Sequence, residues 1–249
     1  MSAMILSSVL LLLGVFINAR PLGAAENPIL KINEDYRNAN FEQALAGYLR
    51  LLETDPYNPS LLYNAGNCHS KLGHTGQAVA YYLRAFNLLP RNSDIRHNLE
   101  YVMKHSGQSF RPEGAPPVVY FVYYFFSYHE LKAISIILFW ILCLSGALYA
   151  VKPGLRETLK SYLAGISILF VFLYLWSAMR TTSPFHNSAV IIRPDVPMLS
   201  GPGENFKAYA NLPEGSIVKV IDSNDLYYEI GVAKEGIKGW IKKEHVEKI

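Results

Sequence analysis

Residues Leu62 to Pro90 read LYNAGNCHSKLGHTGQAVAYYLRAFNLLP, and they carry the clearest pattern in the chain. Part of this pattern occurs 34 residues earlier, where Gln43, Ala44, Tyr48 and Pro56 correspond to Gln77, Ala78, Tyr82 and Pro90. A fixed period of this length is typical of a helical repeat array, in which each unit buries its apolar face against its neighbours. The earlier unit is less regular, because Leu51 and Ala39 stand at the positions of Ala85 and Gly73.

Small residues in the later unit indicate where its two helices meet. Gly66, Ala78 and Ala85 are expected at the closest approach of the paired helices, where a larger side chain would push them apart. Gly73 is expected to end the first helix in the left-handed conformation. The unit is therefore predicted to consist of a helix, a tight turn and a second helix.

Capping residues predict where the helices begin. Asn40 with Gln43 has the spacing of a capping box, and Asn58 before Pro59 marks the start of another helix. Residues Asn92–His105 are predicted to form a further helix, which either begins a third unit or covers the last apolar face of the array. The apolar stripe of this helix consists of Ile95, Leu99, Val102 and Met103.

The stretch from Leu62 to Pro90 resembles the tetratricopeptide repeat. The resemblance implies an all-α solenoid over residues 26–105, whose concave face holds a segment of a partner protein. Carried onto this sequence, the family pattern implies a partner-binding groove lined by Tyr36, Arg37, Tyr63, Asn67, Lys71, His97 and Tyr101. The alternative interpretation is that Tyr63 packs between helices and that Asn67, like Asn64, is a common residue of the repeat consensus.

The two cysteines suggest neither a disulfide nor a catalytic site. Cys68 lies in a repeat helix and Cys143 in a long apolar run, so the two are not expected to meet. Cys68 and His69 are neighbours on one helix, so their side chains point about 100° apart. No third group is evident that would orient them for catalysis. Both residues are interpreted as structural.

The chain begins with an apolar stretch that resembles a secretion signal. Residues 3–17 are apolar apart from two serines, and Gly23-Ala24-Ala25 offers small residues for cleavage before Glu26. Residues 1–25 are therefore predicted to be a signal peptide that exports the repeats. No Lys or Arg precedes the apolar stretch, so its retention as an anchor is the alternative.

Two charge-free runs of nineteen residues, Ala133–Val151 and Ser161–Met179, predict a membrane hairpin. Each run forms roughly 28 Å of helix, close to the hydrocarbon thickness of about 30 Å. Transmembrane helices are predicted over residues 131–151 and 161–180, joined by a loop over residues 152–160. Residues 106–130 combine a linker with an aromatic segment that lies either at the membrane interface or on a packing surface.

Charge in the connecting loop predicts the topology. Lys152, Arg156 and Lys160 outnumber Glu157 there, and short positive loops stay in the cytoplasm. Both ends of the hairpin are then extracytoplasmic. The predicted location is a bacterial inner membrane, which the chain crosses more than once, with the attached domains on the periplasmic side. Ser127-Tyr128-His129-Glu130 has the capping-box spacing at the start of the first span.

Residues 187–249 are predicted to form a small all-β barrel. The candidate strands, separated by turn residues, are Ala189–Arg193, Ile217–Ile221, Tyr227–Val232 and Ile237–Ile241. Ser200-Gly201-Pro202 and Gly239-Trp240-Ile241 resemble the bacterial SH3-like domain, whose relatives bind cell-wall peptides or protein segments. The resemblance implies a groove containing Tyr227, Tyr228 and Trp240, and the alternative for Trp240 is a place in the barrel core.

The order of the modules resembles the BatE family of the Bacteroides aerotolerance group, and the resemblance covers essentially the full chain. It implies a multidomain membrane protein with a tetratricopeptide solenoid, a two-helix transmembrane hairpin and a small SH3-like barrel. The implied partners are membrane-anchored von Willebrand factor A-domain proteins and a MoxR-type ATPase system. The implied process is aerotolerance or stress tolerance.

These modules together predict a non-enzymatic scaffold that holds protein partners beside the membrane lipid. A net charge of +3 without a basic run argues against nucleic acid as a partner. The sequence contains no phosphate loop, metal-ligand cluster or nucleophile motif that would suggest a cofactor, a metal or catalysis. The alternatives are a peptidoglycan-binding anchor that acts through the SH3-like domain, and an enzyme.

Overall fold

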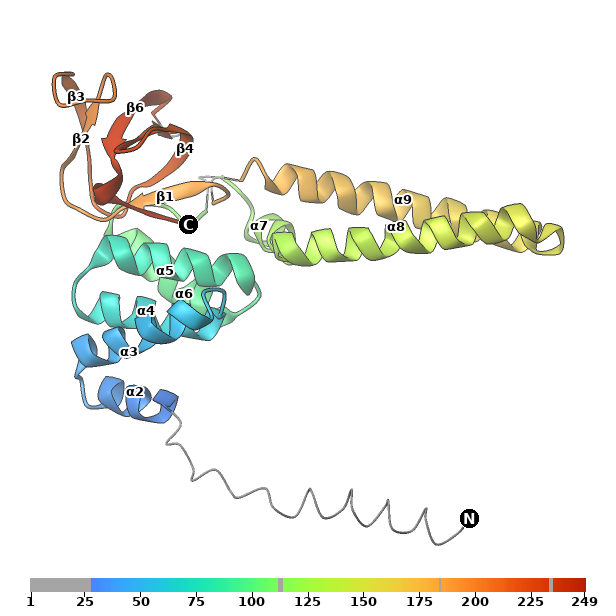
Figure 1. Cartoon of the computed structure of the whole chain (residues 1–249), viewed down its shortest axis with the longest axis horizontal. Coiled ribbons are helices and arrows are strands. Elements are labelled where there is room, and N and C mark those ends of the chain that lie inside the picture. Colours follow the sequence, from blue (N-terminus) through green and yellow to red (C-terminus); the bar gives the residue numbers. More distant parts are fainter. Residues whose placement is uncertain (1–27, 112–113, 184, 233–234) are drawn as a thin grey trace, which may run out of the picture.

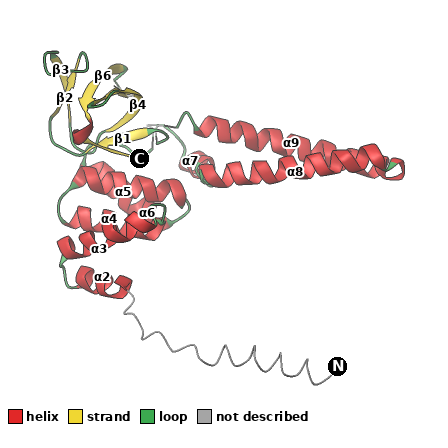
Figure 2. Cartoon of the chain, in the orientation of Figure 1, coloured by secondary structure: helices red, strands yellow, loops and turns green. Residues whose placement is uncertain are grey.

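The computed structural model describes residues 28–111, 114–183, 185–232 and 235–249. The predicted signal peptide, residues 1–25, lies outside the described residues. Figure 1 shows three parts: a stack of short helices, a small β-sheet at one end of this stack, and a long helical hairpin that projects to one side. In Figure 2, the strands are confined to the part of the chain that follows the hairpin.

Among the described residues, five helices form the amino-terminal stack. They are α2 (Pro28–Arg37), α3 (Phe41–Thr54), α4 (Pro59–Lys71), α5 (Thr75–Leu88) and α6 (Ser93–His105). Each helix packs against the next one along the chain, as expected for helical repeats in tandem. By the 34-residue period, α2, α4 and α6 are the first helices of successive units, and α3 and α5 are the second helices.

The helix boundaries follow the predicted capping residues with one exception. The side chains of Asn58 and Asn92 each accept hydrogen bonds from two backbone amides, at the starts of α4 and α6. Gly73 has a φ of 77°, and Ala39, which replaces glycine in the first unit, has a φ of 62°. The capping box expected at Asn40 is wrong, because its side chain makes no capping hydrogen bond. Its ψ of 63° lies outside the extended region usual for a capping residue.

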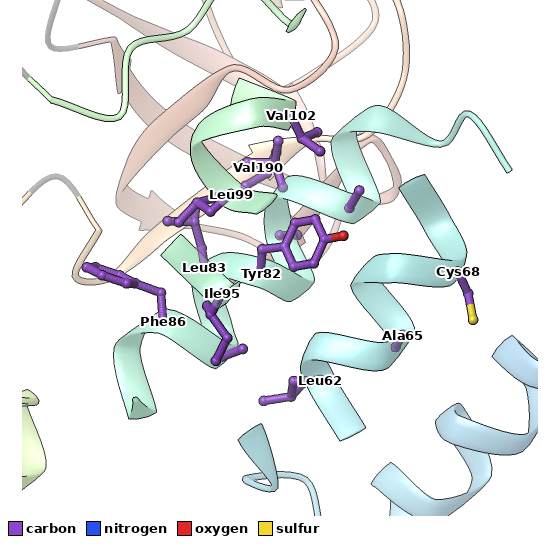
Figure 3. Close-up of a cluster of buried hydrophobic side chains, with 14 of the residues drawn as sticks. Leu62, Ala65, Cys68, Tyr82, Leu83, Phe86, Ile95, Leu99, Val102 and Val190 are labelled. Carbon is purple, nitrogen blue, oxygen red and sulfur yellow. The ribbon is translucent and has the colours of Figure 1, made fainter. Parts of the chain in front are cut away.

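Small residues allow the repeat helices to approach closely, as predicted. Ala78 and Ala85 are fully buried, and a Cβ atom on Gly66 would lie only 2.7 Å from the ring of Tyr82. Figure 3 shows part of the resulting core, to which α4, α5 and α6 all contribute. Its labelled side chains include Leu62, Ala65, Tyr82, Leu83, Phe86, Ile95 and Leu99.

The aromatic side chains of residues 106–130 cover the end of the repeat array. The ring centroids of Phe110 and Tyr124 lie 5.2 and 5.4 Å from that of Phe86 in α5. The short helix α7 (Pro117–Tyr123) belongs to this segment, and several of its apolar side chains, such as Val118, are exposed. One side of the segment therefore packs on the helical core, while the other side is an apolar surface.

Helices α8 (Tyr128–Val151) and α9 (Arg156–Arg180) pack along each other to form the hairpin, and η1 (Pro153–Leu155) joins them. Both helices are long and apolar enough to cross a membrane by length and composition. Large apolar side chains on both are exposed, for example Trp140 at 66% and Ile168 at 72%. The apolar surface of the hairpin thus faces outward and away from the rest of the chain.

The open end of the hairpin is joined to the helical stack by a charged contact. Ser127 and Glu130 form the predicted capping box at the start of α8. Glu130 also forms an ion pair with Arg91, which follows α5, with 2.7 Å between Nη2 and Oε1. Arg91 donates a further hydrogen bond to the carbonyl oxygen of Phe125. These contacts hold the start of the hairpin against the repeats.

Seven antiparallel strands follow the hairpin in the described part of the chain. They are β1 (Ser188–Ile191), β2 (Val196–Leu199), β3 (Ala208–Leu212), β4 (Ile217–Ser223), β5 (Tyr227–Val232), β6 (Ile237–Lys242) and β7 (Val246–Lys248). The four predicted strands correspond to β1, β4, β5 and β6. The strand order is β3-β2-β6-β5-β4-β1-β7, so the sheet is open where we expected closure. Closure would require the edge strands β3 and β7 to pair, and β7 has only three residues.

The sheet packs against α5 through β1. Ala189 and Ile191 of this strand enter the sheet core, whereas Val190 enters the helical core, where Figure 3 labels it beside the repeat side chains. A Cβ atom on Gly76 would collide with the carbonyl oxygen of Ile191. The Gly76 amide also donates a hydrogen bond to Oε1 of Glu214 at 2.7 Å. The repeats and the sheet therefore share one packed interface.

Candidate functional site

The predicted partner-binding face belongs to α2, α4 and α6. The side chains on this face recur every 34 residues and are spaced by four residues within each helix, so they share one side of each helix. They form three columns across the array: Ile29, Tyr63 and His97; Asn33, Asn67 and Tyr101; and Arg37, Lys71 and His105. The columns contain six of the seven predicted groove residues, and the seventh, Tyr36, is the neighbour of Arg37.

Repeated hydrogen bonds link the first and second helices beneath this face. The hydroxyl of Tyr82 donates to Oδ1 of Asn67 at 2.7 Å. In the first unit, 34 residues earlier, the hydroxyl of Tyr48 donates to Oδ1 of Asn33 at the same distance. Because both tyrosines are 2% exposed, these bonds satisfy hydroxyl groups that water cannot reach. Asn33 and Asn67 therefore help to hold the two helices of each unit together beneath the predicted partner-binding face.

A third asparagine extends this support to α6. The amide nitrogen of Asn98 donates to the hydroxyl oxygen of Tyr63 and to Oδ1 of Asn67, both at 3.0 Å. Tyr63 and Asn67 are half-buried, so each combines packing between helices with a partly accessible surface. Asn98 was not among the predicted residues, although it lies 34 positions after Asn64 and the repeat period would have identified it.

The other predicted groove residues are more accessible, with the exception of Tyr36. Arg37, Lys71 and His97 are exposed, and Tyr101 is 57% exposed. Tyr36 is half-buried, and its ring lies edge-on to that of Phe41 at 5.3 Å.

Basic side chains mark one edge of the groove. Arg37, Lys71 and His105 are all exposed and form one column, and none of the three columns contains Asp or Glu. The ring of His105 lies 4.2 Å from that of Tyr101. His105 was not predicted as a groove residue, although it follows Lys71 by one repeat. A face of this charge favours a partner segment that carries carboxylates.

Cys68 and His69 are buried, and neither is chemically activated. Burial raises the pKa of the Cys68 thiol to about 12, so it stays protonated at neutral pH. Burial, followed by the charge of His74, lowers the pKa of His69 to about 4. The imidazole of His69 stacks on Tyr81 at 5.1 Å between ring centroids. These environments suit packing residues, as interpreted from the sequence.

The predicted aromatic residues of the sheet lie on two different faces. Tyr228 pairs with Ile241, which is fully buried, so its side chain is on the core face. Trp240 pairs with Glu229 and lies on the opposite face, together with Tyr227. Trp240 is half-buried and Tyr227 is 5% exposed. On the outer face, Trp240 is therefore more accessible than Tyr227.

The comparisons with known proteins agree with the helical geometry. The family model for the tetratricopeptide repeat matches residues 48–80, which run from α3 through α4 into α5. No curated protein matches the chain. The chain therefore carries a tetratricopeptide repeat, a module that typically binds other proteins and is not itself an enzyme. Among the described residues, no group of three or more His, Cys, Asp or Glu side chains could hold a metal ion.

Proposed function

We propose that this protein is a membrane-anchored, non-enzymatic scaffold that holds a segment of a partner protein on the concave face of its repeats. The main support for the proposal is that the sheet and the predicted partner-binding face lie on different helices of the array. The sheet packs on α5, a second helix of the array, whereas α2, α4 and α6 keep an accessible face with exposed basic and aromatic side chains. A groove of this kind accepts an extended segment or a helix.

The partner segment is proposed to be acidic. Arg37, Lys71 and His105 would meet its carboxylates, while Tyr63 and Tyr101 would contact its apolar side chains. The remaining predicted groove residues, Tyr36, Asn67 and His97, would surround the segment. By the resemblance to the BatE family, the partners would be membrane-anchored von Willebrand factor A-domain proteins that work with a MoxR-type ATPase in an envelope complex.

The hairpin is proposed to span the bacterial inner membrane, with residues 152–160 in the cytoplasm and the repeats and the sheet in the periplasm. The length of the helices supports this placement, because the 24 residues of α8 correspond to about 36 Å against a hydrocarbon core of about 30 Å. The outward-facing apolar side chains of both helices support it as well. The exposed side of α7 would then lie at the membrane interface.

The carboxy-terminal residues 187–249 are proposed to be an SH3-like domain. The short antiparallel strands and the Gly239-Trp240-Ile241 segment in β6 support this proposal. Since this sheet is packed on α5, it would hold a second ligand at a fixed distance from the groove. Two sites on one anchored unit raise the effective concentration of their ligands for each other.

The test is site-specific photocrosslinking of the full chain in native membranes. A benzophenone amino acid replaces Tyr101 in the groove or, as the matched control, Tyr209, an exposed tyrosine of β3. We expect crosslinks to membrane-anchored von Willebrand factor A-domain proteins from position 101 and none from position 209. Lys71→Glu should weaken the crosslink because it reverses the charge of the basic column, whereas Lys207→Glu in an exposed loop should not.

The outcomes separate the alternatives. Equal crosslinking from positions 101 and 209 would contradict a specific groove. Capture of wall fragments alone, together with retention of the chain on purified peptidoglycan that depends on Trp240, would favour the peptidoglycan-binding anchor instead. Reporter fusions that place the repeats in the cytoplasm would exclude the envelope role.

A further inference from the structure

A cavity of about 570 Å³ lies where the repeats, the open end of the hairpin and the sheet meet. All three parts contribute to its wall. Of the described residues that line it, none is Asp or Glu, whereas five carry basic side chains. These are Arg84 of α5, His129 of α8, Arg180 of α9, His186 of the following linker and Lys219 of β4. The cavity has the size usual for a small-molecule site.

Arg180 is the least expected residue of this wall, because it is a charged side chain that is only 4% exposed. Its Nη1 donates hydrogen bonds to the carbonyl oxygens of Tyr123 and Phe126, at 3.1 and 2.8 Å. Its Nε atom is buried and has no hydrogen-bond partner among the described residues. Its guanidinium lies 4.4 Å from the centroid of the Tyr124 ring.

Among the described residues, no carboxylate lies within ion-pair distance of Arg180. The ion pairs found among the described residues involve other cations, and Arg84 is the member of the cavity wall that has a partner, Glu247, at 3.4 Å. Two carbonyl oxygens and the Tyr124 ring replace part of the water that Arg180 loses on burial, but none of them carries a full negative charge. A buried cation without an opposite charge remains unfavourable, so an anion bound in the cavity that Arg180 lines would stabilise it.

The surroundings of His186 report the same excess of positive charge. Burial, and then the nearby charges of Lys219, Lys132 and Arg180, lower the pKa of His186. Lys132 lies over the ring of Tyr128, with 4.8 Å between Nζ and the ring centroid, and that ring lies 5.1 Å from the ring of His186. The charges of Lys219 and Arg180, which both line the cavity, therefore act together at His186.

We propose that this cavity binds the phosphate group of an anionic membrane phospholipid, with Arg180 and Lys219 as its principal donors. Guanidinium and ammonium groups are the preferred donors to phosphate oxygens. The cavity is lined by the end of α9 and the start of α8, which is the depth of the lipid headgroups if the hairpin spans the bilayer. The inference therefore rests on the membrane placement proposed above. A bound lipid would join the repeats, the hairpin and the sheet at one point.

The test uses the full chain in nanodiscs made of equal parts of phosphatidylcholine and phosphatidylglycerol. Native mass spectrometry of the released protein measures which lipid stays bound. We expect phosphatidylglycerol to be retained over phosphatidylcholine by at least about fivefold, as for one or more charge-assisted contacts. Lys219→Gln, a change at an exposed side chain, should reduce this preference, and Arg180→Gln should abolish it. Lys238→Gln is the matched control, because Lys238 is an exposed lysine of the same sheet outside the cavity.

Equal retention of the two lipids, or the same loss of preference in Lys238→Gln, would overturn the proposal. A second arm offers inorganic phosphate to the protein in detergent. Binding of phosphate without any preference for phosphatidylglycerol would assign the cavity to a free anion and overturn the lipid as its source.

Labelling of Cys143 in the same nanodiscs tests the membrane placement separately. Cys143 is exposed on α8, and Cys68 is buried in the repeats. A water-soluble maleimide should not reach Cys143 when the hairpin is inserted. Protection of Cys143 without a lipid preference would contradict only the lipid site. Rapid labelling of Cys143 would contradict the membrane placement as well.

Discussion

At the level of single residues, His69 illustrates how burial sets protonation. It is 8% exposed, and its Nδ1 atom lies 3.4 Å from Nδ1 of His74. Burial is the larger cause and the charge of His74 the smaller one in lowering the pKa of His69 from 6.5 to about 4. The imidazole of His69 is therefore neutral at neutral pH, and its protonation is less favourable in the folded chain than in the unfolded chain.

The stability of the repeats should depend on pH through this residue. Between pH 4 and 6.5 the unfolded chain binds the His69 proton more readily than the folded chain does. The contribution of His69 to the free energy of unfolding should therefore be fully present above pH 6.5 and be lost as the pH falls toward 4. The loss should be on the order of 2 to 3 kcal/mol. Hydrogen exchange of the α4 amides, corrected for the intrinsic rate, measures it. His69→Gln should flatten the dependence, and His97→Gln, at an exposed site, should leave it unchanged. An equal slope in both variants would contradict the assignment.

Among the elements, the turn between α2 and α3 contains a residue other than glycine in the left-handed region. Its residue Ala39 has a φ of 62°, while Gly73 has a φ of 77° at the same position of the second unit. A Cβ atom in this region of backbone space costs about 1 to 2 kcal/mol, a cost that glycine does not have. One of the two irregular positions of the first unit, Ala39, therefore carries backbone strain.

Ala39→Gly should stabilise the pairing of α2 with α3 by about 1 kcal/mol, since relief of the strain exceeds the added entropy of glycine in the unfolded chain. The reciprocal change, Gly73→Ala, should destabilise α4 and α5 by a similar amount; no heavy atom lies within 4 Å of the added Cβ, so the effect would come from the backbone alone. Hydrogen exchange of the α3 and α5 amides measures both. Shifts of the same sign in the two variants would refute this explanation.

In the whole molecule, the sheet is fixed to the repeats and not tethered beside them. Val190 of β1 is fully buried in the helical core, and the carboxylate of Glu214 accepts a hydrogen bond from the backbone of α5. Arg84 and Glu247 add an ion pair across the same interface. The groove and the sheet are consequently held at a fixed distance, and the cavity at the base of the hairpin depends on this arrangement.

Gly76→Ala should loosen this interface, because the added Cβ atom would meet the backbone of Ile191 and Ile192, which cannot move aside as a flexible side chain can. An overpacking cost of about 1 to 3 kcal/mol corresponds to a rise of roughly 5-fold to 150-fold in hydrogen exchange of the β1 amides. Gly146→Ala is the matched control, since nothing lies within 4 Å of a Cβ atom there. Unchanged exchange of β1 in Gly76→Ala would show that the interface is looser than its contacts suggest.

The places of the candidate groove residues on the repeat helices follow from the repeat period, whereas the cavity does not. The period relates Lys71 to His105 and Asn64 to Asn98, so the two residues that were not predicted also have a signal in the sequence. The strands β2, β3 and β7 had a weaker signal, because they are three to five residues long and β3 is mostly exposed. Arg180, His186 and Lys219 come from separate parts of the chain, and no spacing relates them to one another.

The amino-acid pattern alone established the helical repeats, the asparagine cap of α4, the two long apolar helices and four of the strands. These features depend on residues within one or two helical turns, or on a period that neighbouring units share. The docking of β1 on α5 and the basic cavity became evident only in the folded chain. The contact between Gly76 and Glu214 spans 138 positions. Such contacts depend on how surfaces from distant segments fit together, and that fit leaves no trace in the local order of residues.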